Sequence, residues 1–169
     1  NYHEALGHSM TVGSIRNSLL YSSLAVLFDV ALGIAIAFVV VRSAIRWRGV
    51  LDALSMLPLA VPGLVMAFGY LAISSRLSNL DAVKSSPFLE AIFDVRTNPP
   101  PFLVIAYGVR RLPDVVRSAV AGLQQTTVTF EESAANLGAG PATVLRRITL
   151  PLITANLIAG GLLAFAFCM

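Results

Sequence analysis

Few residues of this chain are of the types that carry out chemistry, and their spacing does not assemble a catalytic site. Lys84 is the only lysine, and Ser85 follows it. A phosphate-binding loop of the Gly-x-x-x-x-Gly-Lys-Ser/Thr type needs glycines just upstream, and none lies there. No Ser-His-Asp, Cys-His or paired-carboxylate arrangement is present. We therefore expect a chain that is not an enzyme and that binds no ATP itself.

Residues of the types that ligate metals are equally sparse. His3 and His8 are the only histidines, and Cys168 is the only cysteine. A single cysteine excludes a disulfide within the chain, and the set has no zinc-ligand spacing. We expect no metal site and no cofactor in this chain. The basic residues flank apolar runs instead of forming a stripe interleaved with aromatic side chains, so we also expect no nucleic-acid binding.

The composition is typical of a membrane protein. Hydrophobic residues make up 56% of the chain and charged residues 12%, with a mean hydropathy of +0.77, and soluble domains carry about twice this charged fraction. A helix that spans the bilayer needs roughly 20 apolar residues. We predict an all-α, polytopic membrane helical bundle, one domain over residues 1–169 that is a fragment of a longer protein. The predicted spans are residues 18–41, 50–73, 100–118 and 148–169.

The arginines orient these spans. They cluster in the link between the first two spans, at Arg42, Arg46 and Arg48, and between the apolar part of the third span, residues 102–109, and the last span, at Arg110, Arg111, Arg117, Arg146 and Arg147. Basic residues favour the cytoplasmic side, so both links are predicted to be cytoplasmic. Residues 74–98, which carry mixed charge, are then expected to face outward.

A polar stretch interrupts the apolar second half of the chain, and it predicts a helix–turn–helix over residues 126–147. Thr129 and Glu132 have the spacing of a capping box, in which each side chain satisfies a free backbone N–H. Phe130, Ala134 and Leu137 fall on one face of the first short helix. An apolar face on a compact hairpin can fill a groove of another protein. The alternative is a solvated linker whose apolar face lies on the bilayer or on its own bundle.

The turn of this predicted hairpin is marked by glycine and proline. Gly138 stands where a left-handed residue ends a helix, and Pro141 suits the first position of the next helix. Ile148, Leu150 and Pro151 would lead the chain back into the membrane, because a proline costs little in the first turn of a helix.

The spacing of this segment resembles the EAA loop of permease subunits of ABC importers. The residues that carry the resemblance are Glu132-Ser133-Ala134, then Gly138, then Ile148-x-Leu150-Pro151, with Ser133 in place of the usual first alanine. Three further stretches resemble the subfamily that imports ferric iron, phosphonates, thiamine or polyamines: Asn17-Ser18-Leu19, Leu57-Pro58-Leu59-Ala60-Val61-Pro62-Gly63 and Arg110-Arg111-Leu112-Pro113. Together they cover most of the chain.

The resemblance implies the fold of a type I importer permease in a bacterial inner membrane, with several spans in contact with lipid. It implies an ABC ATPase dimer that binds ATP and Mg²⁺, a second permease half and an extracytoplasmic substrate-binding protein as partners. The residues implied to dock the ATPase are Phe130, Glu132, Ser133, Ala134, Leu137 and Gly138. Ferric iron is the expected cargo, with phosphonate, thiamine or polyamine as alternatives. A channel or secondary transporter that needs no ATP is the competing class.

Two features inside the predicted spans could belong to a translocation pathway. Asp29 lies in the middle of the first span, where charge is costly and faces the bundle interior or a wet path. The alternative is a buried group that is paired with a hydroxyl such as that of Tyr21 or Ser55, or that is protonated in place. Pro58, Pro62 and Gly63 interrupt the second span, and broken helices line many transporter sites. The alternative for these breakers is a kink that only helps packing.

Overall fold

A computed structural model describes residues 9–93 and 99–169 of the chain, and all regular elements within them are helices. The predicted all-α class is confirmed, while His3 and His8 lie outside the described residues. In chain order the elements are α2 (Ser9–Arg42), α3 (Arg48–Ala60), α4 (Gly63–Leu77), α5 (Asp81–Lys84), α6 (Pro87–Phe93), α7 (Pro99–Gln125), α8 (Val128–Asn136), α9 (Pro141–Val144), the π-helical turn η1 (Leu145–Thr149) and α10 (Leu150–Cys168).

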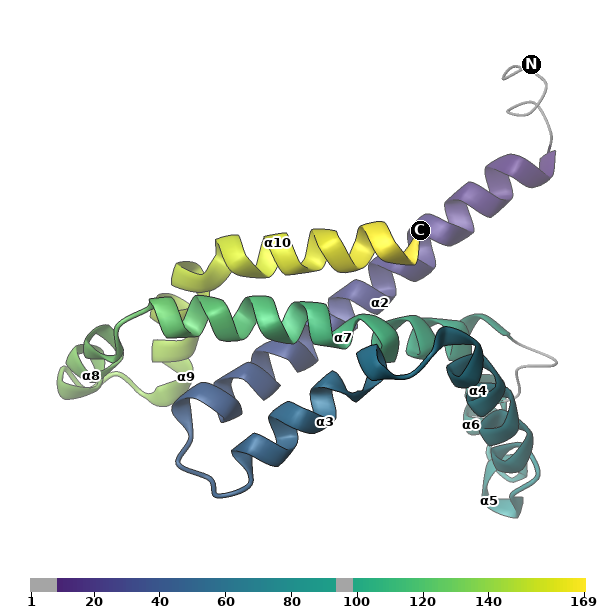
Figure 1. Cartoon of the computed structure of the whole chain (residues 1–169), viewed down its shortest axis with the longest axis horizontal. Coiled ribbons are helices and arrows are strands. Elements are labelled where there is room, and N and C mark those ends of the chain that lie inside the picture. Colours follow the sequence, from purple (N-terminus) through teal and green to yellow (C-terminus); the bar gives the residue numbers. More distant parts are fainter. Residues whose placement is uncertain (1–8, 94–98) are drawn as a thin grey trace.

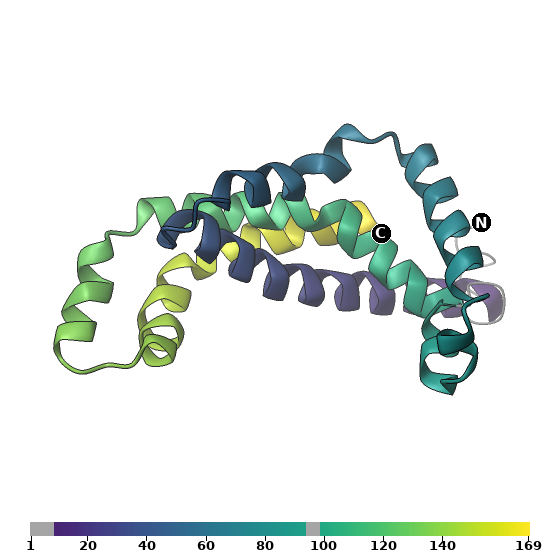
Figure 2. The same cartoon turned by 90° about the horizontal axis from the view of Figure 1, so that it is seen from below.

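The central helix is α7, which packs against α2, α10 and α3 (Figures 1 and 2). Its buried positions 116, 119, 120 and 123 recur with the period of one helix face. They form the main core together with Ala37 of α2 and Ile153 of α10. The hydrophobic core therefore lies along one side of α7 and ties three helices together.

Glycines let the helices approach α7 closely. A Cβ added to Gly33 of α2 would lie 2.8 Å from Cγ1 of Val115, and one added to Gly160 of α10 would lie 2.6 Å from Cβ of Ser118. Neither neighbour leaves room for a side chain. Gly161, the next residue, would meet its neighbours only at ordinary contact distances, so the close approach of α10 to α7 is at Gly160.

The second predicted span is broken rather than continuous. Helices α3 and α4 meet at 105°, so the expected interruption of residues 50–73 is confirmed as a break and is more than a kink within one helix. Pro58 lies inside α3, whereas Val61 is extended, with φ −90° and ψ 126°, and α4 starts after Pro62. A residue before proline is driven out of the helical region, and Gly63, the next residue, adds no helical preference. The pair is a broken span or a re-entrant loop.

Of the other three predicted spans, the first and the last correspond to helices that could cross a membrane, whereas α7, which holds residues 100–118, is not long and apolar enough by the same measure. Two helices of the described chain are long and apolar enough to cross a membrane, Met10–Arg42 and Pro141–Cys168. The first begins well before residue 18, and the second includes part of the predicted hairpin. Residues 100–118 form only the first part of α7, which continues through Pro113 to Gln125. Arg110 and Arg111, which were assigned to a cytoplasmic link, therefore lie inside a helix.

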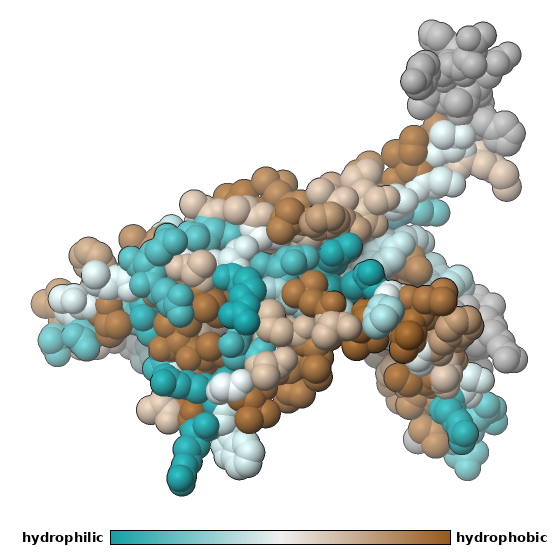
Figure 3. Space-filling model, viewed as in Figure 1, coloured by the Kyte–Doolittle hydropathy of each residue, from teal (hydrophilic) through white to brown (hydrophobic). Residues whose placement is uncertain are grey.

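The bundle has two distinct ends. The α8–α9 hairpin lies at the same end as the α2–α3 turn, and α4, α5 and α6 lie at the other (Figures 1 and 2). Apolar side chains cover much of α10 and α4 on the face shown in Figure 3. The exposed ones on these two helices include Leu152, Ile158, Leu162, Leu163, Leu64, Val65, Phe68 and Leu71. Such a broad apolar surface is typical of a protein that contacts lipid or a partner protein there.

Candidate functional site

The α8–α9 hairpin, residues 128–144, is the part of the chain whose sequence pattern points most directly to a function. Its turn is a Schellman motif. The N–H of Gly138 donates to the Ala135 carbonyl at 2.9 Å, and the N–H of Ala139 donates to the Ala134 carbonyl at 3.0 Å. Gly138 has φ +86°, and Pro141 is the first residue of α9. Both predictions for the turn are confirmed.

The start of α8 differs from the prediction. The N-cap residue is Thr127, with φ −74° and ψ 134°, and its side chain makes no capping hydrogen bond. The helix thus begins two residues earlier than a capping box of Thr129 and Glu132 requires, so that prediction is wrong. Thr126, just before the cap, accepts hydrogen bonds from Arg42 through its carbonyl and its hydroxyl. A tertiary contact therefore coincides with the point where the chain turns into α8.

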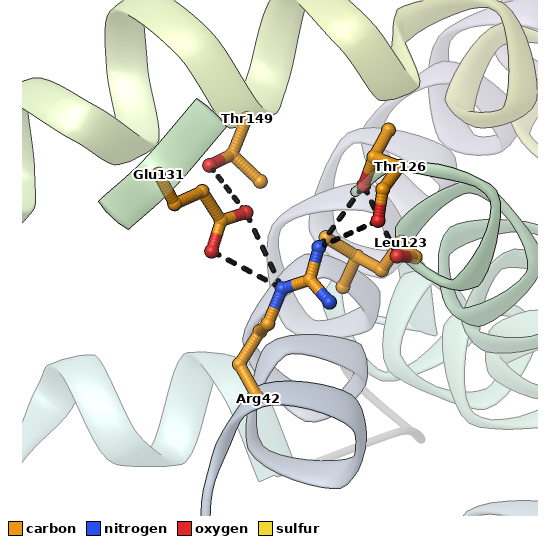
Figure 4. A network of polar contacts seen from close by, with 5 residues as sticks. All are labelled: Arg42, Leu123, Thr126, Glu131 and Thr149. Carbon is orange, nitrogen blue, oxygen red and sulfur yellow. Dashed lines mark hydrogen bonds and ion pairs between the residues drawn. The ribbon is translucent and has the colours of Figure 1, made fainter. Parts of the chain in front are cut away.

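A polar network joins this corner to α2 and η1 (Figure 4). Nε of Arg42, the last residue of α2, lies 3.1 Å from Oε2 of Glu131 and donates a hydrogen bond to Oε1 at 3.3 Å. Nη2 of Arg42 donates to the carbonyl and hydroxyl of Thr126 at 3.2 and 3.1 Å. The hydroxyl of Thr149 donates to Oε1 of Glu131 at 3.1 Å. We call these four residues the Arg42–Glu131 network.

The network is shielded from solvent. The side chains of Arg42 and Glu131 are 11% and 16% exposed, and Thr149 is 1% exposed. Hydrogen bonds between ionised groups are stronger than neutral ones, and shielding reduces their screening by salt. No motif in the sequence points to a role for Glu131. Its neighbour Glu132 fitted a local motif, whereas the partner of Glu131 lies 89 residues away.

All of the predicted docking residues except Ala134 are exposed to solvent. Phe130 is 57% exposed and Leu137 is 90% exposed. Glu132 and Ser133 are exposed, and Ala134 is half-buried. Two large apolar side chains and a free carboxylate thus stand on a short helix that buries no residue. Successive residues on a helix point about 100° apart, which explains how Glu131 and Glu132 face different surroundings.

The return into the bundle runs through a widened turn. The N–H of Leu150 bonds to the Leu145 carbonyl, five residues back, in the π-helical segment η1. Pro151 follows in the first turn of α10. A proline has no N–H and crowds the carbonyl four residues before it, and a π turn just upstream relieves that crowding. Leu150 packs against the core and Ile148 is half-buried, so these predicted closure residues anchor the hairpin base.

The candidate pathway residues Asp29 and Gly63 contact α7 at different positions. Asp29 is fully buried, and neither of its carboxylate oxygens has a hydrogen-bond partner among the described residues. A Cβ on Gly108 would lie 3.0 Å from Oδ1 of Asp29, so the carboxylate faces the α7 backbone and not the hydroxyls of Tyr21 or Ser55. Gly63, at the α3–α4 break, packs against the guanidinium of Arg110. The structure does not bring these residues into one site.

Comparison with known proteins gives this architecture a family. The model of the family described as the binding-protein-dependent transport system inner membrane component matches residues 29–169. The chain belongs to this family. Its family and its two long apolar helices both indicate that the chain is an inner membrane protein.

Several curated permeases are similar to this inner membrane component. The molybdenum transport system permease protein of Escherichia coli K12 is 35% identical over 150 residues, which cover 88% of this chain and 63% of that protein. That of Mycobacterium tuberculosis H37Rv is 30% identical, over 93% of this chain and 59% of the relative. The ferric transport system permease protein of Actinobacillus pleuropneumoniae is 26% identical, over 100% and 23%. The chain thus spans less than two thirds of the length of these relatives.

Proposed function

We propose that this chain forms part of the membrane pathway of an ATP-driven, binding-protein-dependent importer, and that its α8–α9 hairpin docks an ABC ATPase subunit. The observation that carries this proposal is a hairpin closed by a Schellman turn that presents Phe130, Leu137 and Glu132 to solvent at one end of the bundle. Exposed apolar side chains on a short, well-defined helix suit insertion into a groove. The family of the chain and the permease names of its relatives support the same role.

The proposed division of labour assigns energy and delivery to other chains. ATP and Mg²⁺ would bind to an ATPase dimer, because this sequence has no phosphate-binding loop of its own. A second permease half would complete the pathway, and an extracytoplasmic binding protein would deliver the cargo. The hairpin end of the bundle would then be cytoplasmic. The link between α2 and α3 lies at the same end (Figure 1) and carries Arg42, Arg46 and Arg48, which agrees with this orientation.

Docking is tested by removing the exposed apolar side chains. If docking buries them, each truncation in the double variant Phe130→Ala/Leu137→Ala costs about 2 kcal/mol. The affinity of the ATPase for the full-length permease should then fall on the order of 100-fold or more. The matched control is Ile158→Ala/Leu162→Ala on α10, where two similarly exposed side chains should not matter. Unchanged ATPase affinity in the hairpin variant would refute the docking role, and transport without ATP would favour a channel or secondary carrier.

For the cargo, we propose an oxyanion of molybdenum ahead of ferric iron. The support is the identity of the relatives: 35% and 30% for two permeases named for molybdenum, against 26% for one named for ferric transport. Ferric iron, phosphonates, thiamine and polyamines are the competing cargoes. The test is calorimetric titration of the binding protein that co-purifies with the permease. Binding of molybdate without binding of ferric iron is expected, and the reverse result would restore iron as the cargo.

A further inference from the structure

The attachment of the α8–α9 hairpin to the bundle is polar. Neither α8 nor α9 buries a single residue, so the hairpin is not held by a hydrophobic interface of its own. Its specific tertiary contact is the ion pair of Glu131 with Arg42, closed by the hydroxyl of Thr149. Because this contact is short and shielded on both sides, it is better suited to transmit force than an exposed surface pair, which contributes little.

The partners in the network belong to the helices that build the core. Arg42 ends α2, and Thr149 leads directly into α10. Thr126, which accepts from Arg42, donates its hydroxyl to the carbonyl of Leu123 at 3.0 Å, and Leu123 is a buried core residue of α7. The backbone already joins the hairpin to α7 and α10. The Arg42–Glu131 pair is the direct link from the hairpin to α2.

We propose that Arg42 and Glu131 are positioning residues that transmit motion of the α8–α9 hairpin to α2 during ATP-driven transport. This inference rests on the proposed function. Glu131 turns toward the bundle, while Phe130, Glu132 and Leu137 face solvent. Docking and transmission therefore belong to different side chains of one short helix, and substitutions can separate them.

The chain offers a matched control. Arg117 and Asp52 also form an ion pair between two helices, but their closest nitrogen and oxygen are 3.8 Å apart and their side chains are 56% and 29% exposed. This pair joins α7 to α3 and does not touch the hairpin. Breaking it changes the same charges without breaking the link under test.

The experiment uses the full-length permease assembled with its ATPase and reconstituted in vesicles. Three quantities are measured: co-purification of the ATPase, the maximal rate of ATP hydrolysis with loaded binding protein, and the binding-protein concentration that gives half of that rate. In Glu131→Gln we expect normal co-purification, a maximal rate at least about fivefold lower, which is the lower end of typical coupling between sites, and an unchanged half-maximal concentration. The control Asp52→Asn should match the wild type in all three quantities.

Two further variants keep the test decisive if Glu131→Gln fails to assemble. Thr149→Val removes one hydrogen bond to Glu131 with little change of shape, and it should lower the maximal rate in the same direction by a smaller factor. The swap Arg42→Glu/Glu131→Arg restores the ion pair but loses the bond to the Thr126 carbonyl, so it should recover part of the rate lost in Arg42→Glu alone.

Wild-type stimulation in an assembled Glu131→Gln complex would overturn the inference. Wild-type stimulation in Thr149→Val, together with no recovery in the swap, would do the same. A failure of the proposed function looks different, because the wild-type permease itself would then recruit no ATPase. The variant Phe130→Ala/Leu137→Ala separates the two roles further, since it should lose the ATPase and not only the stimulated rate.

Discussion

Replacing Gly138 with alanine should loosen the α8–α9 hairpin by a calculable amount. Gly138 has φ +86°, and an added Cβ would meet nothing within 4 Å. The substitution therefore adds no clash, and its cost comes from the backbone alone. A residue with a side chain pays about 1–2 kcal/mol in the left-handed region. That penalty makes the local opening of the turn about 5–30-fold more favourable.

Gly140 provides the control for this prediction. It also has open space around an added Cβ, but its φ of −69° and ψ of 156° are accessible to any residue. Gly140→Ala should therefore change the stability of the turn by no more than about 0.5 kcal/mol. Gly138→Asn should lie between the wild type and Gly138→Ala, because asparagine tolerates the left-handed region better than alanine.

The assay is hydrogen exchange at residues 138 and 139. Their amides donate to the carbonyls of Ala135 and Ala134, so protection reports closure of the turn directly. Gly138→Ala should lose about 5–30-fold of this protection, while exchange in the core of α7 stays at the wild-type rate. Equal protection in Gly138→Ala and the wild type would refute the strain argument. Equal loss in the Gly140 control would show that the turn is weak for another reason.

Two other predictions concern the bundle. Gly160→Ala should destabilise the α7–α10 contact by about 1–3 kcal/mol, because the new Cβ would lie 2.6 Å from Cβ of Ser118. Gly161→Ala should be tolerated, because its Cβ would meet its neighbours at 3.5 Å or more. Thermal unfolding in detergent compares the two variants, and equal midpoints would contradict the packing argument. Asp29→Asn should raise the unfolding midpoint by about 2–4 °C per kcal/mol gained, because it removes an ionisable carboxyl group that is buried without a partner among the described residues. A lower midpoint would contradict the view that this carboxyl group destabilises the bundle.

The features that could be predicted from the sequence are those that depend on a single residue. The turn at Gly138 and the start of α9 at Pro141 follow from backbone geometry that few other residues allow, and both predictions are confirmed. The break of the second span was harder to place. Pro58 and Pro62 impose the same local restriction, yet α3 continues through the first and ends before the second. Beyond the break, α4 contacts α7 through the edge-to-face pair of Tyr70 and Phe102, a contact between residues distant in the chain that no local pattern predicts.

The polar network could not be predicted because its partners are distant in the chain. Arg42 and Glu131 are separated by 89 residues, and no periodic pattern connects them. The local pattern also pointed to Glu132, and not to Glu131, as the glutamate with a structural role. Thr129 and Glu132 have the spacing of a capping box, but α8 starts at Val128, so Thr129 is not its N-cap residue. The residue just before the N-cap of α8 takes part in a tertiary contact, the hydrogen bonds from Arg42 to Thr126. The capping motif describes an isolated helix, and here the neighbouring helix α2 decides which glutamate is held inside.

Under the proposed function, few contacts between the hairpin and the bundle are an advantage. The hairpin is rigid within itself, because its turn is closed by two backbone hydrogen bonds and a glycine suited to the conformation. A hairpin packed by many apolar side chains would move only if that interface were broken, at roughly 25 cal/mol for each Å² exposed. One shielded ion pair, in contrast, fixes a point of attachment while the rest of the hairpin keeps its freedom. An added apolar interface should therefore stabilise the hairpin and still lower the stimulated rate of ATP hydrolysis.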